Sequence, residues 1–198
     1  MNTYIYEIDD NLYINLTNKC SNACDFCVRN GKDAYYGNKL WLTKEPTAEE
    51  VLSLIDYDKK YNQIVFCGFG EPTEKIDVLI EIAKQLKLKG YTTRLNTNGQ
   101  GNLINGRDIT EELVTCIDYV NVSLNAPDKE SYQRICHSRF GEKAFDELID
   151  FAKKCRNRGI HTVLSIVDVI GMEAVAKCKS LAEENHLMLR IREMITDS

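Results

Sequence analysis

Three cysteines lie close together near the start of the chain, in the segment Cys20-Ser-Asn-Ala-Cys24-Asp-Phe-Cys27. Thiolates at this spacing can surround one metal centre. A closed zinc site takes four ligands, but no histidine lies nearby, because the three histidines are His137, His161 and His186. Three close ligands with no obvious fourth suggest a metal centre with one open coordination position, and at this point both a zinc ion and an iron–sulfur cluster remain open.

The other cysteines are scattered, at positions 67, 116, 136, 155 and 178. The N-terminus lacks the basic start and apolar run of a signal peptide, and no stretch approaches the ~20 apolar residues of a membrane span. We therefore expect a cytoplasmic protein with reduced thiols and no disulfide framework. The net charge of −5 gives no general attraction to nucleic acid or to anionic membranes, so we expect neither as a partner.

Strand-like runs alternate with amphipathic helical runs along the chain, with no linker between them. A hairpin is expected over residues 4–16, and the later strands over 64–67, 92–97, 120–125, 161–169 and 188–192. The expected helices cover residues 47–55, 74–89, 109–117, 130–137, 144–158 and 172–185. Strands separated by such helices predict right-handed βαβ units and a parallel sheet, in a single domain over residues 1–198.

Several expected strands carry a polar face. Asn121, Ser123 and Asn125 alternate with apolar residues, as do Arg94, Asn96 and Asn98, Asn15 and Thr17, and Arg190 and Arg192. A face of this kind cannot form a dry core without large desolvation costs, so it should line a cavity for a polar ligand. This predicts an α/β fold, a partial (β/α)6 TIM-like open barrel with a short N-terminal hairpin. A flat doubly wound sheet is the alternative.

The spacing C-x3-C-x2-C, with Phe26 before the last cysteine, resembles the radical S-adenosylmethionine (radical SAM) superfamily over almost the whole chain. The resemblance implies that Cys20, Cys24 and Cys27 bind three irons of a [4Fe-4S] cluster and that S-adenosyl-L-methionine chelates the fourth. It also implies reductive cleavage of that cofactor to a 5′-deoxyadenosyl radical, which abstracts hydrogen from a substrate. An external one-electron reductant of flavodoxin or ferredoxin type would supply the electron.

Further motifs agree with this resemblance. Gly70-Glu71-Pro72 resembles the family's Gly-Gly-Glu-Pro motif for the methionyl amine, although Phe69 separates Gly70 from Gly68. Residues 96–99 are similar to the family's Thr-Asn-Gly segment, whose alternative interpretation is an ordinary turn. Ser123 and Asn125 match ribose or carboxylate contacts. The resemblance thus assigns to cofactor binding Phe26, Gly68, Gly70, Glu71, Pro72, Asn96, Asn98, Ser123, Asn125, Ser165 and Arg192.

Two features have open roles. Cys136 and His137 are weak candidates for a second hydrogen or proton donor, with a structural role as the alternative. The long connection Val28–Glu45 begins beside the triad and is rich in aromatic residues. It could shield the cluster or contact substrate, or Leu40-Trp41-Leu42 could simply pack against the barrel.

Within the superfamily, the residues around the triad and Leu40-Trp41-Leu42 resemble the small TatD-associated radical SAM proteins. We expect no extension for auxiliary clusters, and a small-molecule substrate. The alternatives are a 7-carboxy-7-deazaguanine synthase-like enzyme and an activase for a glycyl radical enzyme. From another class, the chain could be a non-catalytic iron–sulfur or zinc module, for electron transfer or metal sensing.

Overall fold

A computed structural model describes residues 2–193 of the chain. Its main sheet has the strand order β1-β2-β5-β6-β7-β8-β9. β1 (Ile5–Ile8) pairs antiparallel with β2 (Asn11–Ile14), and each later neighbour in this order pairs in parallel. These later strands are β5 (Gln63–Phe66), β6 (Thr93–Thr97), β7 (Tyr119–Ser123), β8 (His161–Val167) and β9 (Met188–Arg192).

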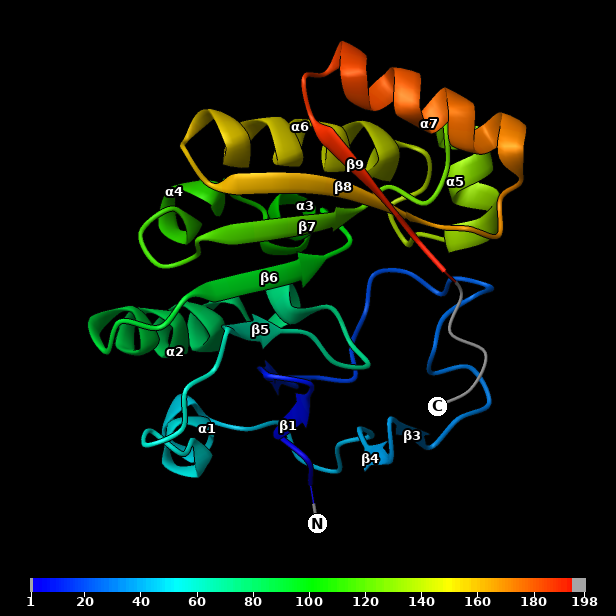
Figure 1. Cartoon of the computed structure of the whole chain (residues 1–198). Helices are drawn as coiled ribbons and strands as arrows, with labels where there is room; N and C mark the ends of the chain where they lie inside the picture. The colour runs from blue at the N-terminus through cyan, green and yellow to red at the C-terminus, as the bar shows by residue number, and fades with distance from the viewer. Residues whose placement is uncertain (1, 194–198) are drawn as a thin grey trace.

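The six parallel strands follow one another in chain order, so each connection makes the same crossover to the next strand. β1 and β9 form the two edges of the sheet and are not paired with each other, which leaves the barrel open (Figure 1). The expected partial (β/α)6 barrel with an N-terminal hairpin is confirmed.

Helices cover the apolar side of the curved sheet (Figure 1). Alternate strand residues such as Ile14, Phe66, Leu95, Val122 and Leu164 are fully buried there, in one continuous core. The helical segments are α1 (Ala48–Leu54), the 3-10 turn η1 (Pro72–Lys75), α2 (Ile76–Leu88), α3 (Gly101–Asn105), α4 (Thr110–Leu113), α5 (Lys129–Cys136), α6 (Lys143–Asn157) and α7 (Met172–Glu184).

Local signals set several boundaries. Thr47 and Glu50 form the expected capping box, in which each side chain accepts a hydrogen bond from the other residue's backbone N–H. The expected helix over 74–89 begins instead as the 3-10 turn η1, where the Glu71 side chain accepts from the Thr73 N–H. The helix expected over 109–117 is shorter, because α4 ends at Leu113 and turns carry the chain on to β7.

The polar face of the strands lies on the inner side of the barrel for β6, β7 and β9. Arg94, Asn96, Asn121 and the two arginines of β9 line one cavity there. The expectation was wrong for residues 15 and 17. The Asn15 amide donates to the Leu40 and Thr3 carbonyls, and Thr17 donates to the Glu45 carboxylate, so both bind the chain itself.

The connection Val28–Glu45 contains a small hairpin, β3 (Ala34–Tyr35) and β4 (Asn38–Lys39). Its turn places Tyr36 and Gly37 at positive φ. Leu40 and Leu42 are buried, so this part of the connection does pack against the barrel. Leu40 also lines the inner cavity together with Val28 and Tyr35, so the connection closes one side of that cavity.

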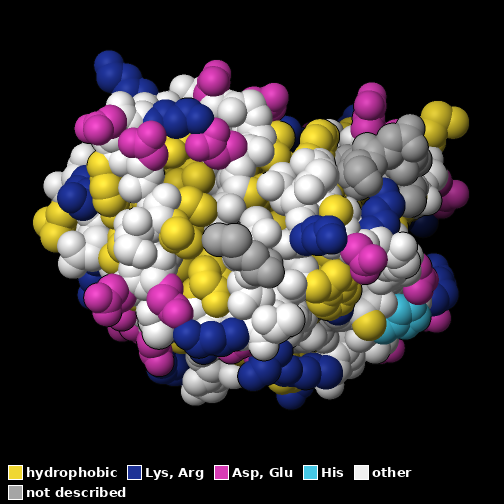
Figure 2. Space-filling model, turned by 90° about the horizontal axis from the view of Figure 1, so that it is seen from below, with side chains coloured by type: hydrophobic (Ala, Val, Ile, Leu, Met, Phe, Trp, Pro, Cys, Tyr) yellow, Lys and Arg dark blue, Asp and Glu magenta, His cyan; other side chains and the backbone are white. Residues whose placement is uncertain are grey.

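Charges of both signs are dispersed among hydrophobic side chains on the face shown in Figure 2. This pattern agrees with the small net charge of −5. In the part of the chain that the structure describes, no helix is both long enough and apolar enough to cross a membrane.

Candidate functional site

The cysteine segment follows β2 at the carboxyl ends of the parallel strands, the edge at which α/β barrels place their sites. Two backbone hydrogen bonds fasten it to the end of α5: Ala23 N–H donates to the Cys136 carbonyl at 3.0 Å, and Asp25 N–H donates to the Ile135 carbonyl at 3.0 Å. The segment therefore has a defined conformation, which a metal centre requires of its ligands.

A network of buried hydrogen bonds also holds the cysteine segment in place. The Asn22 amide donates to the Tyr132 hydroxyl at 2.9 Å, and the Gln100 amide donates both to that hydroxyl and to Asn22 Oδ1. The Asn98 amide donates to Ser21 Oγ at 2.8 Å. Except for Asn98, these residues were not identified from the sequence. Asn22 and Gln100 lie beside recognised motifs, but their partners are distant in the sequence.

The three thiols are half-buried. Burial raises the pKa of Cys20 to about 12, and the nearby Glu71 carboxylate adds to this effect. Burial also raises the pKa of Cys27, while a hydrogen bond with the Cys136 thiol and burial raise that of Cys24. The metal-free thiols therefore hold their protons, and iron binding must displace them.

No three histidine, cysteine or carboxylate side chains within residues 2–193 are gathered so as to hold a single metal ion. A cubane cluster does not need such a grouping, because each thiolate binds a different iron. The donor set itself fits a cluster, since soft thiolates on one short segment are the ligands that iron–sulfur centres use.

Gly68 and Gly70 are required by close contact with residues 15–19, which lead from β2 to the cysteine segment. A Cβ on Gly70 would lie 2.3 Å from the Thr17 carbonyl oxygen and 2.5 Å from that of Lys19. A Cβ on Gly68 would lie 2.0 Å from Asn15 Oδ1. Phe69, between them, is buried and packs edge-on against Trp41. The insertion that departs from the family motif thus joins the end of β5 to the connection after the triad.

Glu71 is buried and its carboxylate is held by the chain. One oxygen accepts from the hydroxyls of Thr73 and Thr97, both at 2.7 Å, and the other accepts from the Asn98 N–H at 2.8 Å. Burial raises the pKa of Glu71, and these hydrogen bonds oppose that effect. In this structure the carboxylate therefore joins the ends of β5 and β6, and Pro72 begins the turn η1 that follows it.

Cys136 and His137 both contact the cysteine segment. Cys136 is fully buried, and its free thiol forms a hydrogen bond with the free thiol of Cys24. His137 has a left-handed backbone conformation, and its Nε2 lies 2.7 Å from Asp25 Oδ1. These contacts favour the structural interpretation of both residues.

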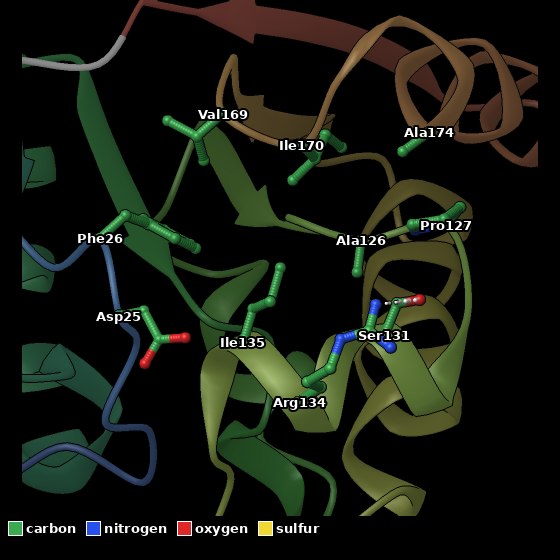
Figure 3. Close-up of a pocket in the computed structure, with 10 residues that line it drawn as sticks. All are labelled: Asp25, Phe26, Ala126, Pro127, Ser131, Arg134, Ile135, Val169, Ile170 and Ala174. Atoms are coloured by element: carbon green, nitrogen blue, oxygen red, sulfur yellow. Dashed lines mark hydrogen bonds between the residues drawn. The ribbon is translucent and has the colours of Figure 1, made fainter.

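A cavity of about 500 Å³ lies beside the cysteine segment (Figure 3). Phe26 points into it opposite Val169 and Ile170, which follow β8, and Ile135 closes its floor. Its lining is mainly apolar, with Asp25, Ser131 and Arg134 contributing polar groups. Apolar walls of this kind can pack against the face of a flat ring, while the polar groups can bind its edge.

Buried polar atoms without partners in residues 2–193 occur at other predicted positions. They include the side-chain oxygens of Asn96, Asn125 and Ser165 and the Nε of Arg192. Such atoms are costly unless a ligand or water satisfies them. They therefore indicate that the inner side of the barrel is built to hold a polar ligand. Ser123 is half-buried, opposite Ser165 in the neighbouring strand.

Comparison with known proteins agrees with this site. A family model described as the radical SAM superfamily matches residues 14–176. A Thermococcus kodakarensis protein named "Probable GTP 3',8-cyclase" is 33% identical over 128 residues, which is 63% of this chain and 38% of that protein. A Methanocaldococcus jannaschii protein named a "Putative glycyl-radical enzyme activating enzyme" is 25% identical over 139 residues, 66% of this chain and 55% of that protein.

Solved structures show the same fold at low identity. Streptococcus suis SuiB bound to S-adenosylmethionine superimposes with a TM-score of 0.73 at 17% identity, covering 96% of this chain and 42% of that one. TYW1 with a lysine-pyruvate adduct gives a TM-score of 0.65 at 18% identity, covering 94% of this chain and 65% of that one.

The chain thus combines an open parallel barrel with a cysteine segment at the carboxyl ends of the strands. This combination is typical of one class of enzymes. The chain belongs to the radical SAM superfamily, whose members use a [4Fe-4S] cluster and S-adenosylmethionine. The matches cover 38% and 55% of the length of the two relatives.

Proposed function

We propose that this chain is a radical SAM enzyme whose Cys20, Cys24 and Cys27 hold the cluster. The observation that carries the proposal is the placement of these three thiols on one braced segment, beside a cavity into which Phe26 points. The bound cluster and cofactor would supply a 5′-deoxyadenosyl radical for hydrogen abstraction from a substrate.

The chain's own residues position this chemistry. Phe26 and Ile170 offer apolar surface for the adenine. Gly68 and Gly70 bring the end of β5 against residues 15–19, directly before the cysteine segment, and Glu71 fixes the end of β6 beside them. We retain Asn96, Asn98, Ser123, Asn125, Ser165 and Pro72 as proposed cofactor contacts, and we retain Cys136 and His137 as weak catalytic candidates.

Cys24 and Cys136 provide a matched test, because their thiols touch and only Cys24 is a proposed ligand. Cys24→Ala should lose the brown colour and the iron, and should stop dithionite-driven cleavage of S-adenosylmethionine to 5′-deoxyadenosine. Cys136→Ala should keep the brown colour, the bound iron and the cleavage of S-adenosylmethionine. The measurements are iron content and product formation after anaerobic reconstitution.

Cys24→Ala with full iron and turnover would refute the ligand assignment. A zinc module predicts a different result for the unsubstituted chain: a colourless protein that retains zinc and cleaves no cofactor.

A second candidate is activation of a glycyl radical enzyme, which the similarity to the Methanocaldococcus jannaschii protein favours. In that case the substrate is a glycine of a large partner. Hydrogen abstraction from a small molecule that is not yet identified remains our first proposal, and a 7-carboxy-7-deazaguanine synthase-like enzyme acting on a pterin is the other alternative. The finer resemblance to TatD-associated proteins, a cytoplasmic location, a flavodoxin or ferredoxin as reductant and a single core domain are part of this proposal.

A further inference from the structure

The inner side of the barrel holds a second cavity, of about 270 Å³, distinct from the one beside Phe26. Its lining combines arginines, amides and tyrosines from β1, β2, β6, β7 and β9 and the connection after the triad. The residues used below are Tyr6, Tyr13, Arg94, Asn96, Asn121, Arg190 and Arg192.

The charge of this cavity is unbalanced. Three of its lining residues are arginines, and none is an aspartate or a glutamate. Arg94 has one hydrogen bond, to the Tyr13 hydroxyl at 3.5 Å, and no ion pair within residues 2–193 involves Arg94, Arg190 or Arg192. The Nε atoms of Arg94 and Arg192 are buried and have no partner there.

Guanidinium groups without counter-ions are costly to remove from water. Burial lowers the pKa of Arg192, and the neighbouring charge of Arg190 adds to this effect. Arg94 and Arg192 are half-buried and Arg190 is exposed, so the cost falls mainly on the first two, and the fold keeps the three charges together without a counter-ion among residues 2–193. This arrangement is expected where the missing counter-ion belongs to a ligand.

Other residues that line the cavity indicate which further chemical groups the ligand carries. The side-chain oxygens of Asn96 and Asn121 are buried without partners, so they can accept from a ligand N–H or O–H. Tyr6 and Tyr13 stack with their ring centroids 5.1 Å apart and add a flat wall. The volume is close to the lower end of the roughly 300–1,000 Å³ typical of small-molecule sites.

We propose that Arg94, Arg190 and Arg192 bind the oxyanion group, a carboxylate or a phosphate, of a small polar substrate that also carries hydrogen-bond donors. The planar guanidinium groups suit either oxyanion, because each can form two parallel hydrogen bonds with it. This inference names the substrate class of the proposed radical SAM site and rests on that function. It moves Asn96 and Arg192 from the proposed cofactor contacts to the substrate cavity.

The test is anion binding by the reconstituted protein, measured calorimetrically with inorganic phosphate and with malonate, against chloride at equal ionic strength. At least one of the two probes should bind, and the stronger one indicates the source of the oxyanion. Arg94→Gln and Arg192→Gln should each weaken its binding by at least about tenfold, as expected when a charge-assisted hydrogen bond is lost. Arg107→Gln, a charge change at a distant ion pair, should leave it within about twofold.

A second measurement covers the stability of the variants. Without ligand, Arg192→Gln should melt at a higher temperature than the unsubstituted protein, since an unpaired charge is removed, whereas loss of a structural arginine would lower it. The inference is overturned if neither probe binds better than chloride, or if Arg107→Gln weakens binding equally. It is also overturned if the cavity variants weaken the binding of S-adenosylmethionine as much as they weaken the binding of the anion. Equilibrium dialysis measures the binding of S-adenosylmethionine. None of these readouts depends on cofactor cleavage, so they are separate from the Cys24 test.

Discussion

At the scale of single residues, one methyl group added at Gly70 should be enough to disturb the metal site. An added Cβ would collide with the backbone carbonyls of Thr17 and Lys19, and Lys19 directly precedes Cys20. Backbone cannot move aside as a flexible side chain can. We therefore expect Gly70→Ala to displace Cys20 and to lower the iron bound after reconstitution to less than about half.

Gly141→Ala is the control for that substitution. Gly141 has a φ of +67°, but nothing lies within 4 Å of an added Cβ, so only about 1 kcal/mol of backbone strain is expected. Equal iron content in the two variants would show that the close contact of Gly70 with the Thr17 and Lys19 carbonyls is unimportant for the metal site.

The sequence was most informative where chemistry is local. The spacing of Cys20, Cys24 and Cys27 and the adjacent Phe26 could be read directly, because all four lie on one short segment. The hydrogen-bond partners of Asn15 and Glu71 could not be read in this way. Their partners, Leu40 for Asn15 and Thr97 and Asn98 for Glu71, lie 25 to 27 residues away in the chain, and only the folded structure brings them together.

At the scale of elements, Asp118 joins the starts of the strands β6 and β7 to the last turn of the helix α2. Its carboxylate accepts from the Thr93 N–H at 2.8 Å and from Lys87 Nζ at 2.6 Å. Burial alone would raise the pKa of Asp118, but the hydrogen bonds from Lys87 and Thr93 outweigh it, and the pKa is lowered.

A lowered carboxyl pKa stabilises the fold above the unfolded-state value, and this contribution is lost as the pH falls through the folded-state value. We therefore expect Asp118→Asn to reduce the free energy of unfolding by about 1–2 kcal/mol at pH 7. The difference should shrink below about pH 4, where the carboxyl group of the unfolded chain is protonated. Urea denaturation at several pH values measures this, with the exposed Asp33→Asn as control. A deficit that is constant with pH would contradict it.

Element types were predictable where the apolar period was long, as in α2, α6 and α7. The helix α3 was missed, because its five residues have little helical preference of their own. It is held by tertiary contacts, such as the Asn105 amide donating to the Thr73 carbonyl at 3.0 Å. The hairpin β3–β4 was also missed, because two-residue strands carry no periodic signal.

At the scale of the whole molecule, the barrel brings three distant segments together behind the metal site. Tyr132 on α5 accepts from Asn22 of the cysteine segment and from Gln100 after β6, each at 2.9 Å. Ser138, after α5, donates to Gln100 Oε1 at 2.9 Å. Since every member of this network is buried, the stability of the fold and the position of the cysteine segment should depend on it together.

Tyr132→Phe tests this coupling, because it keeps the ring and removes only the shared hydroxyl. Two buried amides then lose an acceptor, so we expect the free energy of unfolding to fall by about 1–3 kcal/mol. Because one of those amides belongs to Asn22, between Cys20 and Cys24, the bound iron should also be lost faster to a chelator. Tyr61→Phe is the matched control, since that hydroxyl reaches only Glu7, at 3.3 Å on an exposed edge. Destabilisation of the Tyr132 variant with an unchanged rate of iron loss would show that the network supports the fold and leaves the cysteine segment independent of it.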